Sequence, residues 1–143
     1  MPNGVERVLN HRDTEFTERN QLNEISGKVI GAAIEVHRQL GPGLLESAYS
    51  ACLFHELGLR GLEVKQEVAI PVFYKGIKVD CGYRLDLLVE RQVIVELKAI
   101  EKILPIHEAQ ILTYLKLCQL QLGLIINFNV PILKQGIKRF LNG

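Results

Sequence analysis

The sequence has no tryptophan, only one methionine and three cysteines, and aromatic residues make up 6% of its 143 residues. It also lacks an excess of either charge, because 17 Lys and Arg residues against 16 Asp and Glu residues give a formal net charge of +1. A strongly basic or acidic molecule is therefore excluded, and any basic surface must be local. With 48% hydrophobic and 23% charged residues, the composition is that of a globular protein rather than of a disordered chain.

Long apolar runs and paired cysteines are absent as well. No apolar stretch is long enough to cross a bilayer, and the first residues do not have the charged and then apolar pattern of a signal peptide. We therefore expect no membrane association, no secretion and a cytoplasmic location. Cys52, Cys81 and Cys118 include no Cys-x-x-Cys pair. We expect them to be reduced thiols that pack rather than bind a metal.

The chain divides into a polar start and one longer patterned region. Residues 1–20 lack a sustained period, which predicts a mobile tail with room for a helical turn. Residues 21–143 are of a length typical of a single domain. Within them, apolar positions recur at three and four residues in three segments, which predicts helices over residues 22–40, 45–59 and 105–120.

Elsewhere the apolar period is two, which predicts strands. We expect one strand over residues 63–76, the next two over 77–90 and 92–100, a buried strand over 122–128, and a strand or turn over 132–142. The resulting order is helix, helix, three strands, helix and strand. It indicates an α/β fold with mixed strand directions, flanked by helices.

Charged residues lie inside two of these strands, in "YRLDLLVERQVIVELKAI". If residues 90–92 form a three-residue loop, Asp86 lies directly opposite Glu96, whereas a loop of even length sends the two carboxylates to opposite faces. We favour the three-residue loop, although such loops usually contain a left-handed residue, often glycine, and this one has no glycine. Lys98 shares the face of Glu96 in either register.

Two opposed carboxylates repel each other and need a cation between them. Mg²⁺ takes few carboxylates plus waters and suits a site that also contacts phosphate, and Mn²⁺ is a possible substitute. Lys98 could then hold an attacking water or stabilise charge on a phosphate. The alternative is a structural ion cluster in which Lys98 neutralises Asp86 and Glu96, and these three residues alone do not decide between the two.

Other polar residues lie on the predicted helices. His107, Gln110 and Tyr114 form one stripe of the third helix, where a site is one explanation for the last two and a surface or capping role is favoured for His107. Glu46 opens the second helix, where a carboxylate also suits the helix N-terminus. The preceding Gly-Pro-Gly follows a helix and lacks a phosphate-loop motif, so nucleotide binding of that kind is not expected.

Seven segments, taken in order, resemble the GxxExxY proteins, a family assigned to the PD-(D/E)xK nuclease superfamily. They are "GPGLLESAY", "YKGIKV", "YRLDLLVE", "VIVELKAI", "HEAQILTYLK", "LGLIINF" and "GIKRFLN". The resemblance covers about Ile25 to Asn142. It implies a restriction-endonuclease-like core of a helix, a three-stranded meander, a helix and a strand, with an extra N-terminal helix.

The resemblance also implies a Mg²⁺-dependent nuclease that acts on DNA or RNA. Its implied site residues are the metal-binding acids Glu46, Asp86 and Glu96, the lysine Lys98 that orients or activates water, and the supporting pair Gln110 and Tyr114. Leu85 stands where the superfamily often has a proline.

Three functions stay open at this point. The chain is an active nuclease, an inactive nucleic-acid-binding or regulatory module with the same fold, or an interaction protein whose polar cluster is structural. Local basic residues that could contact phosphates are Lys75, Lys78, Lys134, Lys138 and Arg139. A homodimer is one way for so small a domain to grip a long duplex, and no feature of the sequence decides it.

Overall fold

A computed structural model describes residues 11–143, with side chains from residue 15 onward. Its helices are α2 (His11–Leu40), α3 (Glu46–Leu59) and α4 (Pro105–Cys118), with a 3₁₀ turn η1 (Leu133–Gly136). Its strands are β1 (Val64–Ala69), β2 (Val72–Tyr74), β3 (Ile77–Val79), β4 (Arg84–Val89), β5 (Val93–Lys98), β6 (Leu122–Asn127) and β7 (Ile137–Leu141).

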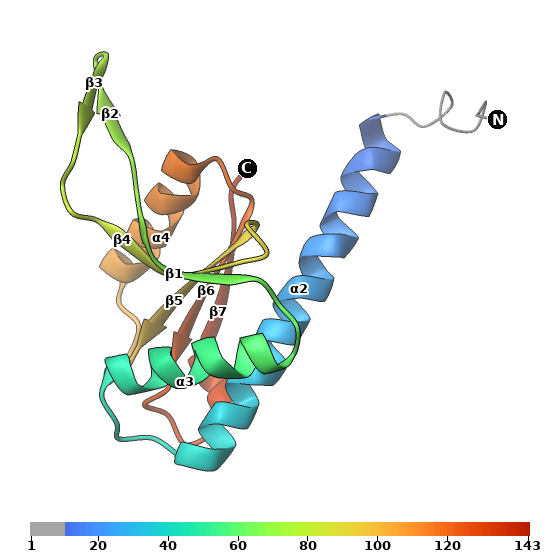
Figure 1. The fold of residues 1–143 in the computed structure, drawn as a ribbon, viewed down its shortest axis with the longest axis vertical. Coiled ribbons are helices and arrows are strands. Elements are labelled where there is room, and N and C mark those ends of the chain that lie inside the picture. Colours follow the sequence, from blue (N-terminus) through green and yellow to red (C-terminus); the bar gives the residue numbers. More distant parts are fainter. Residues whose placement is uncertain (1–10) are drawn as a thin grey trace.

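A five-stranded mixed sheet forms the centre of the molecule, in the order β1-β4-β5-β6-β7 (Figure 1). Neighbouring strands are antiparallel except β5 and β6, which are parallel and are joined by α4. The α/β fold is therefore a restriction-endonuclease-like core, with α2 as the extra N-terminal helix, and the predicted fold class is confirmed. The buried strand expected near residues 122–128 is β6, and the end of the chain forms η1 and β7.

Helices cover both faces of the sheet and create two hydrophobic cores. On one face, α2 and α3 pack against residues such as Leu87, Val95 and Leu97. On the other, α4 packs against Ile94 and Ile125. Because successive residues of β5 alternate between the two cores, Glu96 lies on the α4 face of the sheet.

The first helix begins at His11, eleven residues before the predicted start at Leu22. Residues 15–21 are exposed, and Figure 1 shows this end of α2 projecting away from the sheet. A helical segment that is exposed all round has no apolar period, so the sequence pattern could not reveal these first turns. They extend the part of α2 that is anchored in the core by buried Ile25 and Val29. Residues 11–20, predicted as part of a mobile tail with room for a helical turn, belong instead to α2, and residues 1–10 lie outside the described residues.

Two predicted strands are each broken in the structure. The strand over residues 63–76 stops before Pro71, which has no N–H to donate to a sheet. The strand over residues 77–90 is interrupted at Asp80–Tyr83, where Gly82 has a φ of +73° and donates its N–H to Asp80 Oδ1 at 3.1 Å. As a result β2 and β3 pair as a separate two-stranded sheet, and this ribbon projects from the core (Figure 1).

Candidate active site

The register of the β4–β5 hairpin agrees with the three-residue loop. Val89 pairs with Val93 and Leu87 with Val95, so the next step of the same register joins Asp86 to Glu96. The odd-length loop over residues 90–92 is thus confirmed.

This loop uses two left-handed residues without glycine. Glu90 and Arg91 have φ values of +53° and +57°, each of which costs about 1 kcal/mol relative to an ordinary conformation. The chain leading into β1 offsets part of this cost: the Glu90 N–H donates to the carbonyl of Glu63 at 2.7 Å, and Arg91 Nε donates to Glu63 Oε1 at 3.0 Å.

The two strands separate at Asp86. Their paired residues end at Leu87 and Val95. One step further, the N–H of Leu97 donates to Asp86 Oδ2 at 2.8 Å, so a side-chain oxygen replaces a backbone acceptor. The backbone therefore opens where the two carboxylates face each other.

The same position interrupts the alternation of the sheet. Leu87 and Val89 belong to the core under α2 and α3, whereas Leu85 belongs to the α4 core, although strict alternation would put all three on one face. On the neighbouring strand, Glu67 has a φ of +55° and lies between the paired residues on either side. Asp86 thus sits in a local distortion that β1 and β4 share.

Glu96 is an ionisable group buried inside the sheet. It is 7% exposed, and its Oε1 has no hydrogen-bond partner among the described residues. Burial, and then the nearby charge of Asp86, raise the pKa of Glu96 to about 9, while Lys98 opposes the rise. A buried carboxyl with a free oxygen is costly unless something occupies that oxygen.

Glu46 reaches the same region from the other side of the sheet. It is the first residue of α3, and partial burial raises its pKa, which the charge of Lys98 lowers and that of Asp86 raises further. A hydrogen bond from the backbone of Ala99, one residue beyond β5, also acts on this carboxyl. Glu46, Asp86 and Lys98 are therefore electrostatic neighbours.

The α4 stripe borders the site in part. Tyr114 is 7% exposed, and its pKa is raised by burial, then by the charges of Glu96, Tyr83 and Asp86. A side-chain hydrogen bond with exposed Gln110 lowers it. Tyr114 thus lies beside Asp86 and Glu96. Gln110 is linked to these two carboxylates only through its hydrogen bond with Tyr114.

His107 has a structural role instead. Its Nδ1 accepts the N–H of Leu104 at 2.9 Å and so caps the start of α4. The surface or capping role predicted for this residue is confirmed.

Comparison with known families adds to this geometry. The model of the PD-(D/E)XK nuclease superfamily matches residues 23–140. The chain belongs to this superfamily. No curated protein and no solved structure matches the chain significantly. Within residues 11–143, no helix combines the length and apolar character that a bilayer crossing requires.

For a member of the PD-(D/E)XK superfamily, the donor set suits a hard divalent cation. Asp86 and Glu96 offer carboxylate oxygens, and one oxygen of Glu96 lacks a partner. In the described part of the chain, no three His, Cys, Asp or Glu side chains lie close enough to hold a metal ion together. The residues present therefore fit an ion that binds two carboxylates and keeps its waters.

A closed structural ion cluster fits less well. In the described part of the chain, the ion pairs within 4.0 Å do not include Lys98. Lys98 acts on Glu46 and Glu96 only at longer range, and its side chain is half-buried. Among the described residues, Lys98 therefore does not close the cluster with a direct ion pair.

Two tyrosines at this site were not predicted as functional residues. The Tyr49 hydroxyl donates to the carbonyl of Gly41 at 2.6 Å and accepts the N–H of Leu44 at 3.1 Å, and its ring stacks on Phe128 with 4.4 Å between centroids. Tyr49 thereby fixes the loop that leads to α3. Its signals in the sequence were its position three residues after Glu46 and its place at the end of the GxxExxY motif, and neither gave it a role.

Tyr83 is the second of these residues. Its ring lies 6.2 Å from that of Tyr114, and 48% of it is exposed. Tyr83 directly precedes β4, in the irregular segment between β3 and β4. The alternating pattern of the sequence gave no clear signal for this interruption.

Proposed function

We propose that this protein is a metal-dependent nuclease that hydrolyses phosphodiester bonds in DNA or RNA. One observation carries the proposal: the buried carboxyl of Glu96, with an unpartnered oxygen, lies beside Asp86 at the point where β4 and β5 separate. Membership in the PD-(D/E)XK superfamily supports it.

Asp86 and Glu96 would hold Mg²⁺, or Mn²⁺ in its place, with Glu46 bound directly or through water. The ion would supply Lewis-acid polarisation and positive charge at a phosphate oxygen. Since a carboxylate must lose its proton to bind a metal, Glu96 would be protonated at neutral pH in the empty site and ionised in the loaded one.

The remaining residues act on water and phosphate. The ammonium of Lys98, which has no close ion-pair partner among the described residues, is available to orient an attacking water or to stabilise charge on the phosphate. The raised pKa of Tyr114 keeps its hydroxyl protonated at neutral pH, so it acts as a hydrogen-bond donor. Gln110 supports that hydroxyl or contacts the backbone of the nucleic acid.

Cleavage assays test the proposal directly. Purified protein is incubated with single- and double-stranded DNA and RNA in Mg²⁺, in Mn²⁺ and in EDTA. We expect cleavage only with metal, and its loss in Lys98→Ala. Lys116→Ala, which changes an exposed lysine of α4, is the matched control. The proposal is rejected if no substrate is cut, or if Lys98→Ala cuts as fast as the wild type.

The inactive nucleic-acid-binding or regulatory module is the alternative. The described residues do not assemble a complete three-ligand metal cluster, which would favour it. Salt-dependent binding to nucleic acid without cleavage would select this alternative.

We further propose that the chain is a GxxExxY protein. The motif falls on Gly43, Glu46 and Tyr49, and the hydrogen bonds of Tyr49 give the motif a structural reason. The single domain over residues 21–143, the homodimer and the cytoplasmic location stay predictions. All three cysteines are free thiols, which fits a reducing compartment.

A further inference from the structure

The β2–β3 ribbon exposes large apolar side chains that neither core covers. Phe73 is 64% exposed, Tyr74 63% and Ile77 65%. All three lie on a ribbon of three-residue strands that projects from the sheet (Figure 1). Because Phe73 pairs with Lys78 and Tyr74 with Ile77, Phe73 lies on one face of the ribbon and Tyr74 and Ile77 lie on the other. Large apolar side chains exposed on both faces of a projecting ribbon are typical of an interaction surface.

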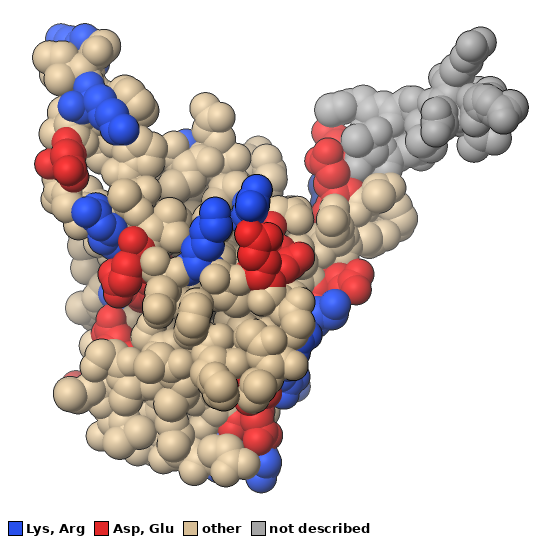
Figure 2. Space-filling view, viewed as in Figure 1, with Lys and Arg blue, Asp and Glu red and all other residues tan. Residues whose placement is uncertain are grey.

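Basic residues are interleaved with these rings. Lys75 and Lys78 are exposed on the ribbon and Arg84 at its base, against the single acidic residue Asp80 in the same stretch. Lys75 Nζ lies 5.4 Å from the centre of the Tyr74 ring. Figure 2 shows basic side chains at the tip and along the side of the ribbon, although the net charge of the whole chain is only +1. The ribbon is therefore a local basic and aromatic surface.

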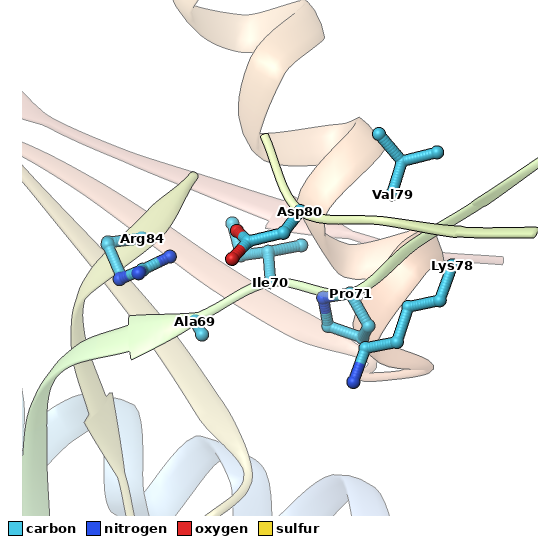
Figure 3. A pocket seen from close by; sticks show the side chains of 7 residues that line it. All are labelled: Ala69, Ile70, Pro71, Lys78, Val79, Asp80 and Arg84. Atoms are coloured by element: carbon cyan, nitrogen blue, oxygen red, sulfur yellow. The ribbon is translucent and has the colours of Figure 1, made fainter. Parts of the chain in front are cut away.

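The segment that follows the ribbon links this surface to the candidate active site. A pocket of about 320 Å³ lies at the base of the ribbon, with Lys78 and Arg84 on opposite sides and Asp80 between them (Figure 3). The Ile70 N–H donates to the carbonyl of Tyr83 at 3.0 Å and closes this base. Tyr83 in turn lies beside Tyr114, so one short segment connects the ribbon to the carboxylate pair.

We infer that the ribbon and the segment that follows it bind a single-stranded stretch of the nucleic acid next to the bond that is cut. Phe73 and Tyr74, one on each face of the ribbon, and Tyr83 beyond it would stack on bases, while Lys75 and Lys78 would contact phosphates. The inference rests on the proposed function for the identity of the ligand, and it adds which form of nucleic acid is held and where.

Single strands fit this surface better than a duplex for two reasons. The ring faces can stack only on bases that are not already stacked within a helix. A duplex is held mainly by many phosphate contacts, whereas this surface offers three cations. Stacking of bases on the rings would supply binding energy that three phosphate contacts alone do not.

Binding measurements in EDTA test the inference without interference from cleavage. The probes are fluorescein-labelled oligo(dT), oligo(U) and a blunt DNA duplex of equal length, followed by fluorescence anisotropy at several salt concentrations. The variants are Phe73→Ala/Tyr74→Ala and Lys75→Gln/Lys78→Gln. The matched controls on α2 are Phe16→Ala, whose ring is 66% exposed, and Lys28→Gln.

We expect wild type to bind at least one single strand more tightly than the duplex. The ring variant should lose about tenfold or more in affinity for that single strand. The lysine variant should make the negative slope of log K against log salt shallower by about 1.4, because it removes two phosphate contacts. The controls should bind like wild type. Ring and control side chains are exposed, so all four variants should fold, which circular dichroism checks.

Other results overturn the inference. It fails if no probe binds, if the duplex binds as tightly as both single strands, or if the ring variant binds like wild type. It also fails if the ring variant changes only the molar mass seen by light scattering, since the ribbon would then be a contact between copies of the chain. Binding through the ribbon without any cleavage would reject the proposed nuclease activity and leave the binding role of the ribbon standing. Cleavage that the ribbon variants do not affect would reject the binding role and leave the nuclease activity standing.

Discussion

The carboxylate of Asp86 accepts the N–H of Leu97 at 2.8 Å, one step after the backbone pairing of β4 and β5 has ended. One side chain thus does two things: its Oδ2 completes the hydrogen bonding of a buried strand, and its charge faces Glu96. These tasks can be separated by substitution.

Replacement of Asp86 by Asn or by Ala should therefore have different effects. Asp86→Asn keeps an acceptor oxygen for Leu97 and should leave the free energy of unfolding nearly unchanged, while abolishing cleavage. Asp86→Ala leaves the buried N–H of Leu97 without a partner and should cost about 1–3 kcal/mol as well. Denaturant unfolding and cleavage assays measure the two effects. Equal stability of both variants would show that the hydrogen bond is not structural.

Glu96 should make the metal-free protein less stable as pH rises. Its pKa is raised to about 9 in the folded protein from an ordinary value of 4.5, so the folded state binds a proton that the unfolded state has already lost between these values. Its stabilising contribution is complete below about pH 4.5 and is lost as pH rises toward 9.

Glu96→Gln, which mimics the protonated carboxyl, should remove this dependence. We expect the variant to be more stable than wild type at neutral pH, by about 3 kcal/mol, with a flatter profile of unfolding free energy against pH in EDTA. Glu101→Gln, at an exposed glutamate, is the control and should follow wild type. Parallel profiles for wild type and Glu96→Gln would contradict the prediction.

Bound metal should cancel this loss of stability with rising pH. Because Glu96 must release its proton to bind Mg²⁺ or Mn²⁺, affinity should rise with pH up to about 9, by as much as about tenfold per pH unit. The thermal midpoint of the wild type should therefore rise more on addition of metal at about pH 8 than at about pH 6, and EDTA should reverse it. Glu96→Gln and Asp86→Asn should show little rise. Calorimetry in two buffers measures the released proton, and a metal response independent of pH would argue that Glu96 is not a ligand.

The sequence allowed the order of the core elements and the Asp86–Glu96 register to be predicted, because periodicity and loop parity are local properties. It did not reveal the distortion at Asp86: Leu85 and Leu87 alternate normally in the sequence but pack in different cores. It also did not separate the ribbon from the sheet, since Val72 to Tyr74 are as apolar as a core strand and only Pro71 marks the break. Which strand leaves a sheet depends on tertiary pairing, and a one-dimensional pattern does not contain it.

The same limit applies to the site residues. Glu46 was placed by resemblance, since a glutamate at a helix start has an ordinary explanation in the helix dipole. The role of Tyr49, which holds the loop before Glu46, could not be found by spacing alone, because its partners are backbone groups of Gly41 and Leu44.

Tyr49→Phe should test whether that loop controls Glu46. The variant keeps the ring that stacks on Phe128 but loses two buried hydrogen bonds, which should cost about 1–3 kcal/mol in unfolding free energy. If the loop holds Glu46 in place, the metal concentration needed for half-maximal cleavage should rise several-fold, as it should in Glu46→Gln. The double variant should then be little worse than Glu46→Gln alone, because both changes remove the same contribution. Additive losses in the metal titration would show that Tyr49 supports only the fold, and that Glu46 is positioned by the N-terminus of α3 itself.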